Sequence, residues 1–199
     1  MSGFTLFSQT ISYLEVLGIL TGLAGVWLTI KKNILCFPVG IVNVAIYAYL
    51  FFDPSVRLYA DAILQINYLI LLIYGWLNWK NKENNSETLV RTKEPMMKTA
   101  ILISIPAFIM LSLFLQNFTN ASLPWLDSGL TVLSLLAQWM IARKLLQNWI
   151  IWIVVDAIYV PLYFYKNLPL TSMLYSVFLL LAIKGYFDWK KNINSSQTA

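Results

Sequence analysis

Seven segments of this 199-residue chain are long and apolar enough, or nearly so, to cross a lipid bilayer. A spanning helix needs about 20 mostly apolar residues. Only helices and closed barrels can span, because lipid offers no hydrogen-bond partners to the backbone. The segments are continuously apolar rather than alternating, which favours helices. They are residues 12–30, 33–52, 58–79, 98–117, 126–143, 146–165 and 168–189. The sequence predicts an all-α integral membrane protein with seven transmembrane helices.

The composition leads to the same prediction. The chain is 59% apolar and only 12% charged, whereas a soluble domain usually carries about 25% charged residues. No polar stretch is long enough to build a second, soluble domain. We assign the net charge of +5 to residues at membrane boundaries rather than to a nucleic-acid partner. The single cysteine, Cys36, excludes a disulfide within the chain.

The basic residues are unevenly divided between the two sides of a seven-span topology. One side receives eleven of them, and the other receives only Arg57 and Lys166. Lys and Arg concentrate in cytoplasmic loops, so we expect an outside N-terminus and a cytoplasmic C-terminus. The eleven are Lys31, Lys32, Lys80, Lys82, Arg91, Lys93, Lys98, Arg143, Lys144, Lys190 and Lys191.

Residues 15–79 and 127–189 repeat one pattern at a spacing of about 112 positions. The landmark pairs are Glu15 and Asp127, Trp27 and Trp139, Lys31-Lys32 and Arg143-Lys144, Asn43 and Asp156 (at 113), and Gly75–Lys80 and Gly185–Lys190 (at 110). Glu15 and Asp127 lie near span ends, where we expect a structural duty such as capping a helix. Doubled units of this kind place a substrate site where the two halves meet.

The spans thus divide as 3+1+3. Residues 1–97 hold the first three-helix repeat and a cytoplasmic linker, and 98–117 form a connecting helix. Residues 126–191 hold the second repeat, and we expect 192–199 to be a disordered tail. The odd helix returns the chain to the starting side, so the repeats run parallel, as in the SWEET transporters.

Catalysis has little support in this sequence. There is no histidine, the commonest general base and metal ligand. No Gly-rich phosphate loop with its lysine is present, and no carboxylate cluster has the spacing of a metal site. An enzyme built on Asp or Glu pairs is the only catalytic alternative. We therefore predict no catalytic residues, no metal and no cofactor.

Polar and aromatic residues inside the spans are the candidates for function. A carboxylate within the membrane is costly and usually faces a cavity or a partner. Two helical stripes carry such groups: Asp61, Gln65 and Tyr68 in span 3, and Trp149, Trp152, Asp156, Tyr159 and Tyr163 in span 6. A carboxylate beside an aromatic wall suits a flat organic cation, which gains cation–π attraction and a counter-charge.

Structural roles for the same residues stay open at this point. Asp61 and Asp156 could each bind a neighbouring hydroxyl or amide and hold helices together. Asn43 and Asn67 could line a pathway or bridge two helices. Gly22, Gly25 and Gly40 are expected to permit close helix contact.

The string from Asn148 to Asp156, NWIIWIVVD, resembles the W-x-x-W-x-x-x-N/D signature of the PnuC family of vitamin transporters. Further matching stretches extend the resemblance over residues 13–189; among them are Glu15–Gly22, Gly40–Asn43, Tyr59-Ala60 with Gln65, Tyr74–Trp76, Asp127-Ser128, Val132–Ser134 and Arg143-Lys144. It implies the same 3+1+3 fold, homotrimers, and a site that includes Asn148. It also implies facilitated diffusion of an unphosphorylated vitamin across the bacterial inner membrane, followed by trapping through a cytoplasmic vitamin kinase.

The departures from that family concern charge. Asp156 ends a signature that ends in Asn in nicotinamide riboside carriers, and Asp61 stands where we expect a small neutral residue. Two added carboxylates favour thiamine, the substrate of the family's PnuT branch, slightly over nicotinamide riboside. A proton-coupled carrier that uses both aspartates, or a non-transporting scaffold or sensor, is the alternative. We expect the chemistry where the copies differ, with Asp156 replacing Asn43, and Trp149 and Trp152 replacing Cys36 and Val39.

Overall fold

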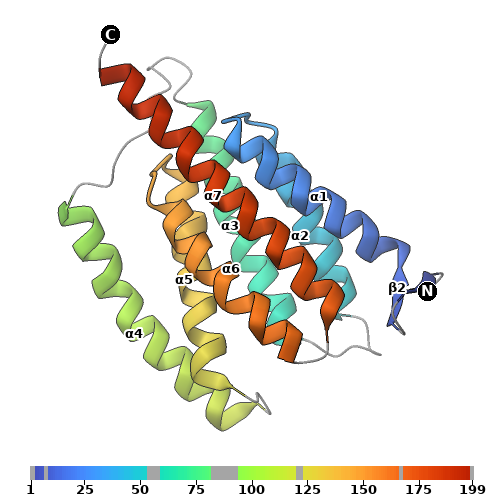
Figure 1. Cartoon of the computed structure of the whole chain (residues 1–199). Helices are drawn as coiled ribbons and strands as arrows, with labels where there is room; N and C mark the ends of the chain where they lie inside the picture. Colours follow the sequence, from blue (N-terminus) through green and yellow to red (C-terminus); the bar gives the residue numbers. More distant parts are fainter. Residues whose placement is uncertain are drawn as a thin grey trace. The chain divides into compact units, whose positions relative to one another are not determined.

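The computed structural model of the chain describes residues 3–6, 9–52, 59–81, 94–119, 123–165 and 168–197. Within these residues two short strands precede seven α-helices, which confirms the predicted number of helices (Figure 1). The chain divides into two compact units, residues 1–87 and 88–199, and each is described by itself. The elements are β1 (Gly3–Leu6), β2 (Gln9–Ser12), α1 (Tyr13–Ile30), α2 (Cys36–Phe52), α3 (Tyr59–Lys80), α4 (Glu94–Phe118), α5 (Pro124–Ala142), α6 (Asn148–Tyr165) and α7 (Pro169–Gln197).

Most of these helices have the length and composition of membrane spans. Among the described residues, α1, α4, α5, α6 and α7 are long and apolar enough to cross a bilayer. The apolar part of α2, Cys36–Phe51, is somewhat shorter. Helix α3 has 22 residues, which at about 1.5 Å per residue matches a hydrocarbon core of about 30 Å.

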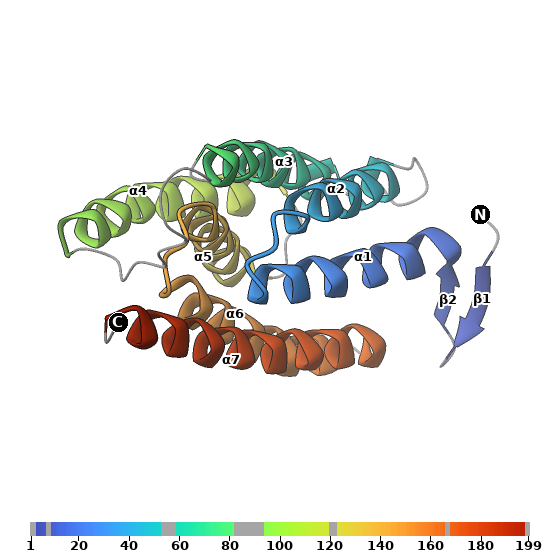
Figure 2. The ribbon, with the colours of Figure 1, turned by 90° about the horizontal axis from the view of Figure 1, so that it is seen from above.

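A β-hairpin at the N-terminus was not expected from the sequence. Strands β1 and β2 pair antiparallel, with Gly3 opposite Ser12, beside the start of α1 (Figure 2). Ser12 then caps α1: its Oγ accepts a hydrogen bond from the Glu15 N–H at 3.1 Å. The Glu15 carboxylate accepts one from the Ser12 N–H at 2.7 Å. This capping box satisfies two N–H groups at the helix start and confirms the expected role of Glu15.

In the first unit, α2 packs against both α1 and α3. Glycines allow the close approach at two points. A Cβ added to Gly18 of α1 would lie 3.0 Å from the Tyr47 ring, and one added to Gly40 of α2 would lie 2.9 Å from Leu72 of α3. Gly25 has more room, because the nearest Val39 atom would be 4.0 Å from its added Cβ.

The helices α1 and α5 end in the same hydrogen-bonded turn. The Lys32 N–H donates to the Thr29 carbonyl at 3.0 Å, and the Asn33 N–H donates to the Leu28 carbonyl at 2.9 Å. At positions 112 residues later, Lys144 donates to Ile141 at 2.9 Å, and Leu145 to Met140 at 3.0 Å. This is a Schellman motif, whose C′ residue is left-handed. Lys32 and Lys144 accordingly have φ values of 56° and 57°.

One aromatic pair also recurs in both units. Phe37 of α2 meets Trp79 of α3 edge to face, with ring centroids 5.0 Å apart and an interplanar angle of 86°. Trp149 of α6 meets Trp189 of α7 in the same way, at 5.4 Å and 89°. All four side chains are buried. Each pair therefore anchors the second helix of a repeat to the third.

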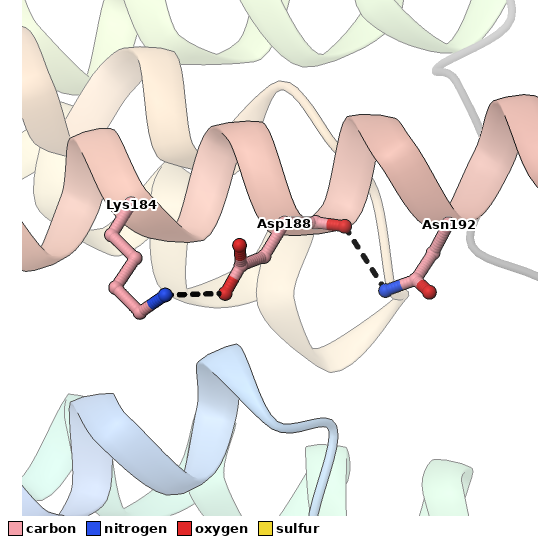
Figure 3. A network of polar contacts seen from close by, with 3 residues as sticks. All are labelled: Lys184, Asp188 and Asn192. Carbon is pink, nitrogen blue, oxygen red and sulfur yellow. Dashed lines mark hydrogen bonds and ion pairs between the residues drawn. The ribbon is translucent and has the colours of Figure 1, made fainter.

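The second unit joins α4 to α5, α5 to α6, and α6 to α7. Helix α7 continues to Gln197, so the expectation of a disordered tail at 192–199 is wrong as far as residue 197. Just before this stretch Lys184 pairs with Asp188 at 3.0 Å, and at its start Asn192 donates to the Asp188 carbonyl at 3.0 Å (Figure 3). Packing also continues into this stretch, because Ile193 retains only 6% of its accessible surface.

Candidate functional site

The first half of α6 contains the most buried polar groups of the predicted site. Asn148, Trp149 and Asp156 retain only 0%, 2% and 3% of their accessible surface. Among the described residues, no hydrogen bond or ion pair reaches the Asp156 carboxylate. The structure therefore shows none of the hydroxyl or amide partners that a purely structural role would need. A carboxylate buried in a membrane helix without a partner is a functional candidate by default.

Two further polar atoms at the start of α6 are unsatisfied. The Asn148 side chain donates to the Leu145 carbonyl at 2.5 Å, but its Oδ1 is buried with no hydrogen-bond partner. The indole N–H of Trp149 is in the same condition. Buried polar atoms are nearly always hydrogen-bonded in folded proteins. One acceptor and one donor in adjacent residues can therefore recognise a polar ligand.

The two tryptophans of the signature have different surroundings. The Trp149 ring lies directly over Gly185 of α7, so that a Cβ added there would come within 2.7 Å of three ring atoms. Together with the Trp189 contact, this places Trp149 in the core of the α6–α7 pair. Trp152 is only half-buried. Of the two, Trp152 keeps the larger accessible surface.

Further along α6, Tyr159 and Tyr163 belong to a cluster of three tyrosine rings. Their rings lie 5.4 Å apart, and each also packs on Tyr175 of α7, at 4.7 Å and 5.1 Å respectively. Nearby, the Ser172 hydroxyl of α7 donates to the Val160 carbonyl of α6 at 2.8 Å. Sequence reasoning missed Tyr175, because a single tyrosine in an otherwise apolar span carries no periodic signal.

The predicted residues of α3 are only partly described. Gln65 and Tyr68 are half-buried, while the side chain of Asp61 lies outside the described part of the structure. Helix α3 belongs to the first unit and α6 to the second. The convergence of the two stripes stays a prediction.

Asn43 of α2 holds two helices together. Its side-chain amide donates to the Gly18 carbonyl at 2.6 Å and to the Thr21 hydroxyl at 3.1 Å, both on α1. The sequence left open whether Asn43 bridges helices or lines a pathway, and the structure shows the bridge.

The structure corrects the correspondence between the two repeats. The Schellman turns, the starts of α2 and α6, and the aromatic residues Phe37 and Trp149 recur at a spacing of 112, whereas their ring partners Trp79 and Trp189 recur at 110. Asp156 therefore corresponds to the buried Val44, and not to Asn43. Likewise Trp149 corresponds to Phe37 and Trp152 to Gly40, so the expected pairing with Cys36 and Val39 was wrong by one residue.

Comparisons with known proteins agree with this description. A family described as nicotinamide mononucleotide transporter matches residues 12–191. The nicotinamide riboside transporter PnuC of Escherichia coli (strain K12) is 25% identical, over 94% of this chain and 87% of its own length. The riboflavin/roseoflavin transporter RibM of Streptomyces davaonensis is 24% identical, over 94% of this chain and 88% of its own.

A solved structure shares the fold. The crystal structure of the vitamin B3 transporter PnuC superposes with a TM-score of 0.75 at 23% identity, covering 92% of this chain and 83% of that one. Together these findings confirm the resemblance to the PnuC family that the span 6 signature indicated. They also fit the expectation of a transporter rather than an enzyme.

Proposed function

Since the chain belongs to the nicotinamide mononucleotide transporter family, we propose that it carries an unphosphorylated, cationic vitamin across the membrane. The observation that carries this proposal is the buried, unpartnered carboxylate of Asp156 on α6. A flat cation supplies the missing counter-charge, so binding substrate repays the cost of burying that carboxylate. The relatives named above transport vitamins that contain flat heteroaromatic rings.

Thiamine is our first candidate substrate. Its thiazolium ring carries a fixed positive charge, and its aminopyrimidine can donate hydrogen bonds to a carboxylate. Nicotinamide riboside is the second candidate, because several relatives are named as its transporters and its pyridinium ring is also cationic. Riboflavin, the cargo named for RibM, is neutral and would gain nothing from the additional carboxylate.

The residues of the proposed site divide by task. Trp152 stacks on the vitamin ring, and Asp156 provides the counter-charge. The unsatisfied Asn148 Oδ1 and Trp149 N–H, which are already desolvated, accept and donate hydrogen bonds. Tyr159 and Tyr163, now with Tyr175, extend the aromatic surface along α6 and α7. In the first unit, Asp61, Gln65 and Tyr68 stay predicted ligand-binding residues, whereas Asn43, which was also predicted to bind the ligand, bonds to α1.

The broader arrangement follows the same proposal. The two triplets α1–α3 and α5–α7 form parallel repeats, and α4 connects them in a 3+1+3 topology. Transport is facilitated diffusion, with the N-terminus outside and the C-terminus in the cytoplasm of a bacterial inner membrane. The protein works as a homotrimer and depends on a cytoplasmic vitamin kinase for net uptake.

Calorimetric titration of the purified protein with thiamine and with nicotinamide riboside tests the substrate. Replacing Asp156 by Asn should weaken thiamine binding about tenfold or more, since a charged hydrogen bond contributes about 1.5–3 kcal/mol. Asp188→Asn is the matched control, because it removes an exposed carboxylate from an i, i+4 ion pair. Tight nicotinamide riboside binding with no thiamine binding would reject the first candidate.

The two tryptophans give a second, independent test of the site. Trp152→Ala should abolish ring stacking and reduce affinity, whereas Trp149→Phe restores the aromatic residue of the first repeat and keeps the core contact with Trp189. We expect the first variant to lower affinity more than the second. If both variants bound the vitamin with the affinity of the wild type, neither tryptophan would contribute to vitamin binding.

Proton-coupled uptake is the competing mechanism, and the same buried carboxylate favours it. In liposomes that contain the purified protein, a facilitator equilibrates vitamin on both sides whatever the pH gradient. A coupled carrier accumulates vitamin above the outside concentration and loses that accumulation when an uncoupler is added.

A further inference from the structure

The last turns of α6 contain a proline within the cluster of tyrosine rings. Pro161 lies inside the helix, between Tyr159 and Tyr163. A proline has no N–H group, so Pro161 cannot donate the usual helical hydrogen bond to the Ala157 carbonyl. Sharp bends in helices occur mostly at such positions, and membrane helices tolerate them. The part of α6 that follows Asp156 therefore has a defined position at which it can bend.

Two contacts hold α7 to the part of α6 that precedes the proline. The Val160 carbonyl accepts a hydrogen bond from the hydroxyl of the buried Ser172 at 2.8 Å. The Tyr159 ring packs on Tyr175 of α7, with centroids 4.7 Å apart. Both contacts can stay in place when α6 bends at Pro161, because neither involves a residue beyond it.

Tyr163 is the member of the cluster that follows the proline. Its ring stacks on Tyr159 at 5.4 Å and on Tyr175 at 5.1 Å, with interplanar angles of 22° and 21°. All three side chains are only half-buried. Contacts between aromatic rings are individually modest in energy, so they can break and form again. A bend at Pro161 that moves the end of α6 away from α7 separates Tyr163 from both partners.

The start of α6 is held more firmly. The buried Trp149 ring packs edge to face on Trp189, and a Cβ added to Gly185 would come within 2.7 Å of it. No proline interrupts the helix between Trp149 and Asp156. Asp156 therefore lies between a tightly packed start of α6 and an end that can bend.

We propose that the end of α6 beyond Pro161 is the outer gate for the vitamin: the tyrosine cluster closes the way to Asp156, and a bend at Pro161 opens it. Tyr159 and Tyr163 follow Asp156 at spacings of three and four residues, so all three share one stripe of the helix. In the orientation proposed above, α6 runs from the cytoplasm outward, and the cluster lies on the outer side of the carboxylate. This inference rests on the proposed function and on that orientation.

Replacing Pro161 by Ala tests the hinge. The variant regains the backbone hydrogen bond to Ala157, which a bend then has to break, so vitamin uptake into liposomes should slow about fivefold. Vitamin affinity measured by calorimetry should stay that of the wild type, since no ligand-binding group is removed. Pro106→Ala is the matched control, because it also removes a proline from inside a membrane-spanning helix, α4, which belongs to neither repeat. It should leave the uptake rate unchanged.

Spin labels measure the bend without any vitamin. In a Cys36→Ser background, which removes the single native cysteine, labels are attached at two exposed positions, Phe164 beyond the proline and Leu180 of α7. Double electron–electron resonance should give two Phe164–Leu180 distances in this parent protein and one after Pro161→Ala is added. Labels at Leu180 and at Ile150, which precedes the proline, are the control and should give one distance in both proteins.

Three results would overturn the gate. The first is uptake by Pro161→Ala at the wild-type rate, and the second is equal slowing by Pro106→Ala. The third is a single Phe164–Leu180 distance in the parent protein. Failure of both thiamine and nicotinamide riboside to bind would instead reject the proposed function, and the spin-label distances would still decide whether α6 bends.

Discussion

The two three-helix repeats share their scaffold but differ in the residues of the second helix. In both, the first helix ends in a Schellman turn with a left-handed lysine, and an edge-to-face aromatic pair joins the second helix to the third. Yet α2 carries Gly40 and Val44 where α6 carries Trp152 and Asp156. The contacts that the two repeats share specify how three helices pack. The residues that differ between the repeats are therefore available for binding a substrate.

The α2 residues at those positions show what packing alone requires. Gly40 leaves room for Leu72, because a Cβ added to this glycine would lie only 2.9 Å from the Leu72 side chain. Val44 is buried as a core residue. At the corresponding positions, α6 has a large half-buried ring and a buried carboxylate, and burying a carboxylate without a partner costs stability. The second repeat therefore gives up stability at these positions, as binding sites commonly do.

Replacing Asp156 by Val tests this exchange most directly, since it restores the residue of the first repeat. We expect thiamine affinity to fall about tenfold to hundredfold, because a charged partner is lost. The free energy of unfolding should rise by about 1–3 kcal/mol, because a buried unpaired carboxylate is removed. Titration calorimetry and thermal unfolding in detergent measure the two quantities. A variant that loses both stability and affinity would show that Asp156 is a structural residue.

A substitution at Gly185 tests the aromatic contact of the second repeat, in which the larger Trp149 stands at the position of Phe37. Gly185→Ala places a Cβ within 2.7 Å of the Trp149 ring, which Trp189 confines on another side. Such overpacking should lower the free energy of unfolding by about 1–3 kcal/mol. Gly25→Ala is the control, with its nearest neighbour at 4.0 Å, and should cost little. If both variants unfold at the wild-type temperature, the Trp149–Gly185 contact does not hold α6 to α7.

The scaffold was largely predictable from the sequence, because it depends on patterns that a single chain displays. Apolar run length gave the seven helices, and recurring landmarks gave the doubling. The N-terminal hairpin escaped notice because its two strands have only four residues each. The tail was misassigned because its polar composition suggested disorder, whereas α7 continues to Gln197 and buries Ile193 on the way.

The site was less predictable for a physical reason. Aromatic and carboxylate residues within a span can be recognised from the sequence alone. Their contact partners cannot, because these depend on packing between helices that are distant in the sequence. Trp149 and Trp152 look equivalent in the signature, yet only Trp149 is pressed onto Gly185. Asn43 looked like the counterpart of Asp156, yet it bonds across to α1. A one-residue error in the repeat spacing rotates a helical position by about 100°, which is enough to exchange a bridging residue for a core residue.

Asn43→Val tests whether the bridge to α1 is this residue's main role, since Val155 stands at the corresponding position of α6. Loss of two hydrogen bonds should lower the free energy of unfolding by about 1–3 kcal/mol. Combining it with Thr21→Val should show coupling, because the two side chains bond each other at 3.1 Å. Unchanged stability together with weaker vitamin binding would instead place Asn43 on the substrate pathway.

The smallest expected effect concerns the turns that both repeats share. Lys32 and Lys144 adopt left-handed φ values, which cost a non-glycine residue about 1–2 kcal/mol. Glycine removes that cost, but it also makes the unfolded chain more flexible, which lowers stability by about 0.5–1 kcal/mol. Lys32→Gly and Lys144→Gly should therefore each raise the free energy of unfolding by at most about 1.5 kcal/mol. Lys31→Gly should lower it, because Lys31 has an ordinary φ of −75°. The two left-handed positions should respond alike, and opposite signs would mean that the matching turns do not share one energetic role in the two repeats.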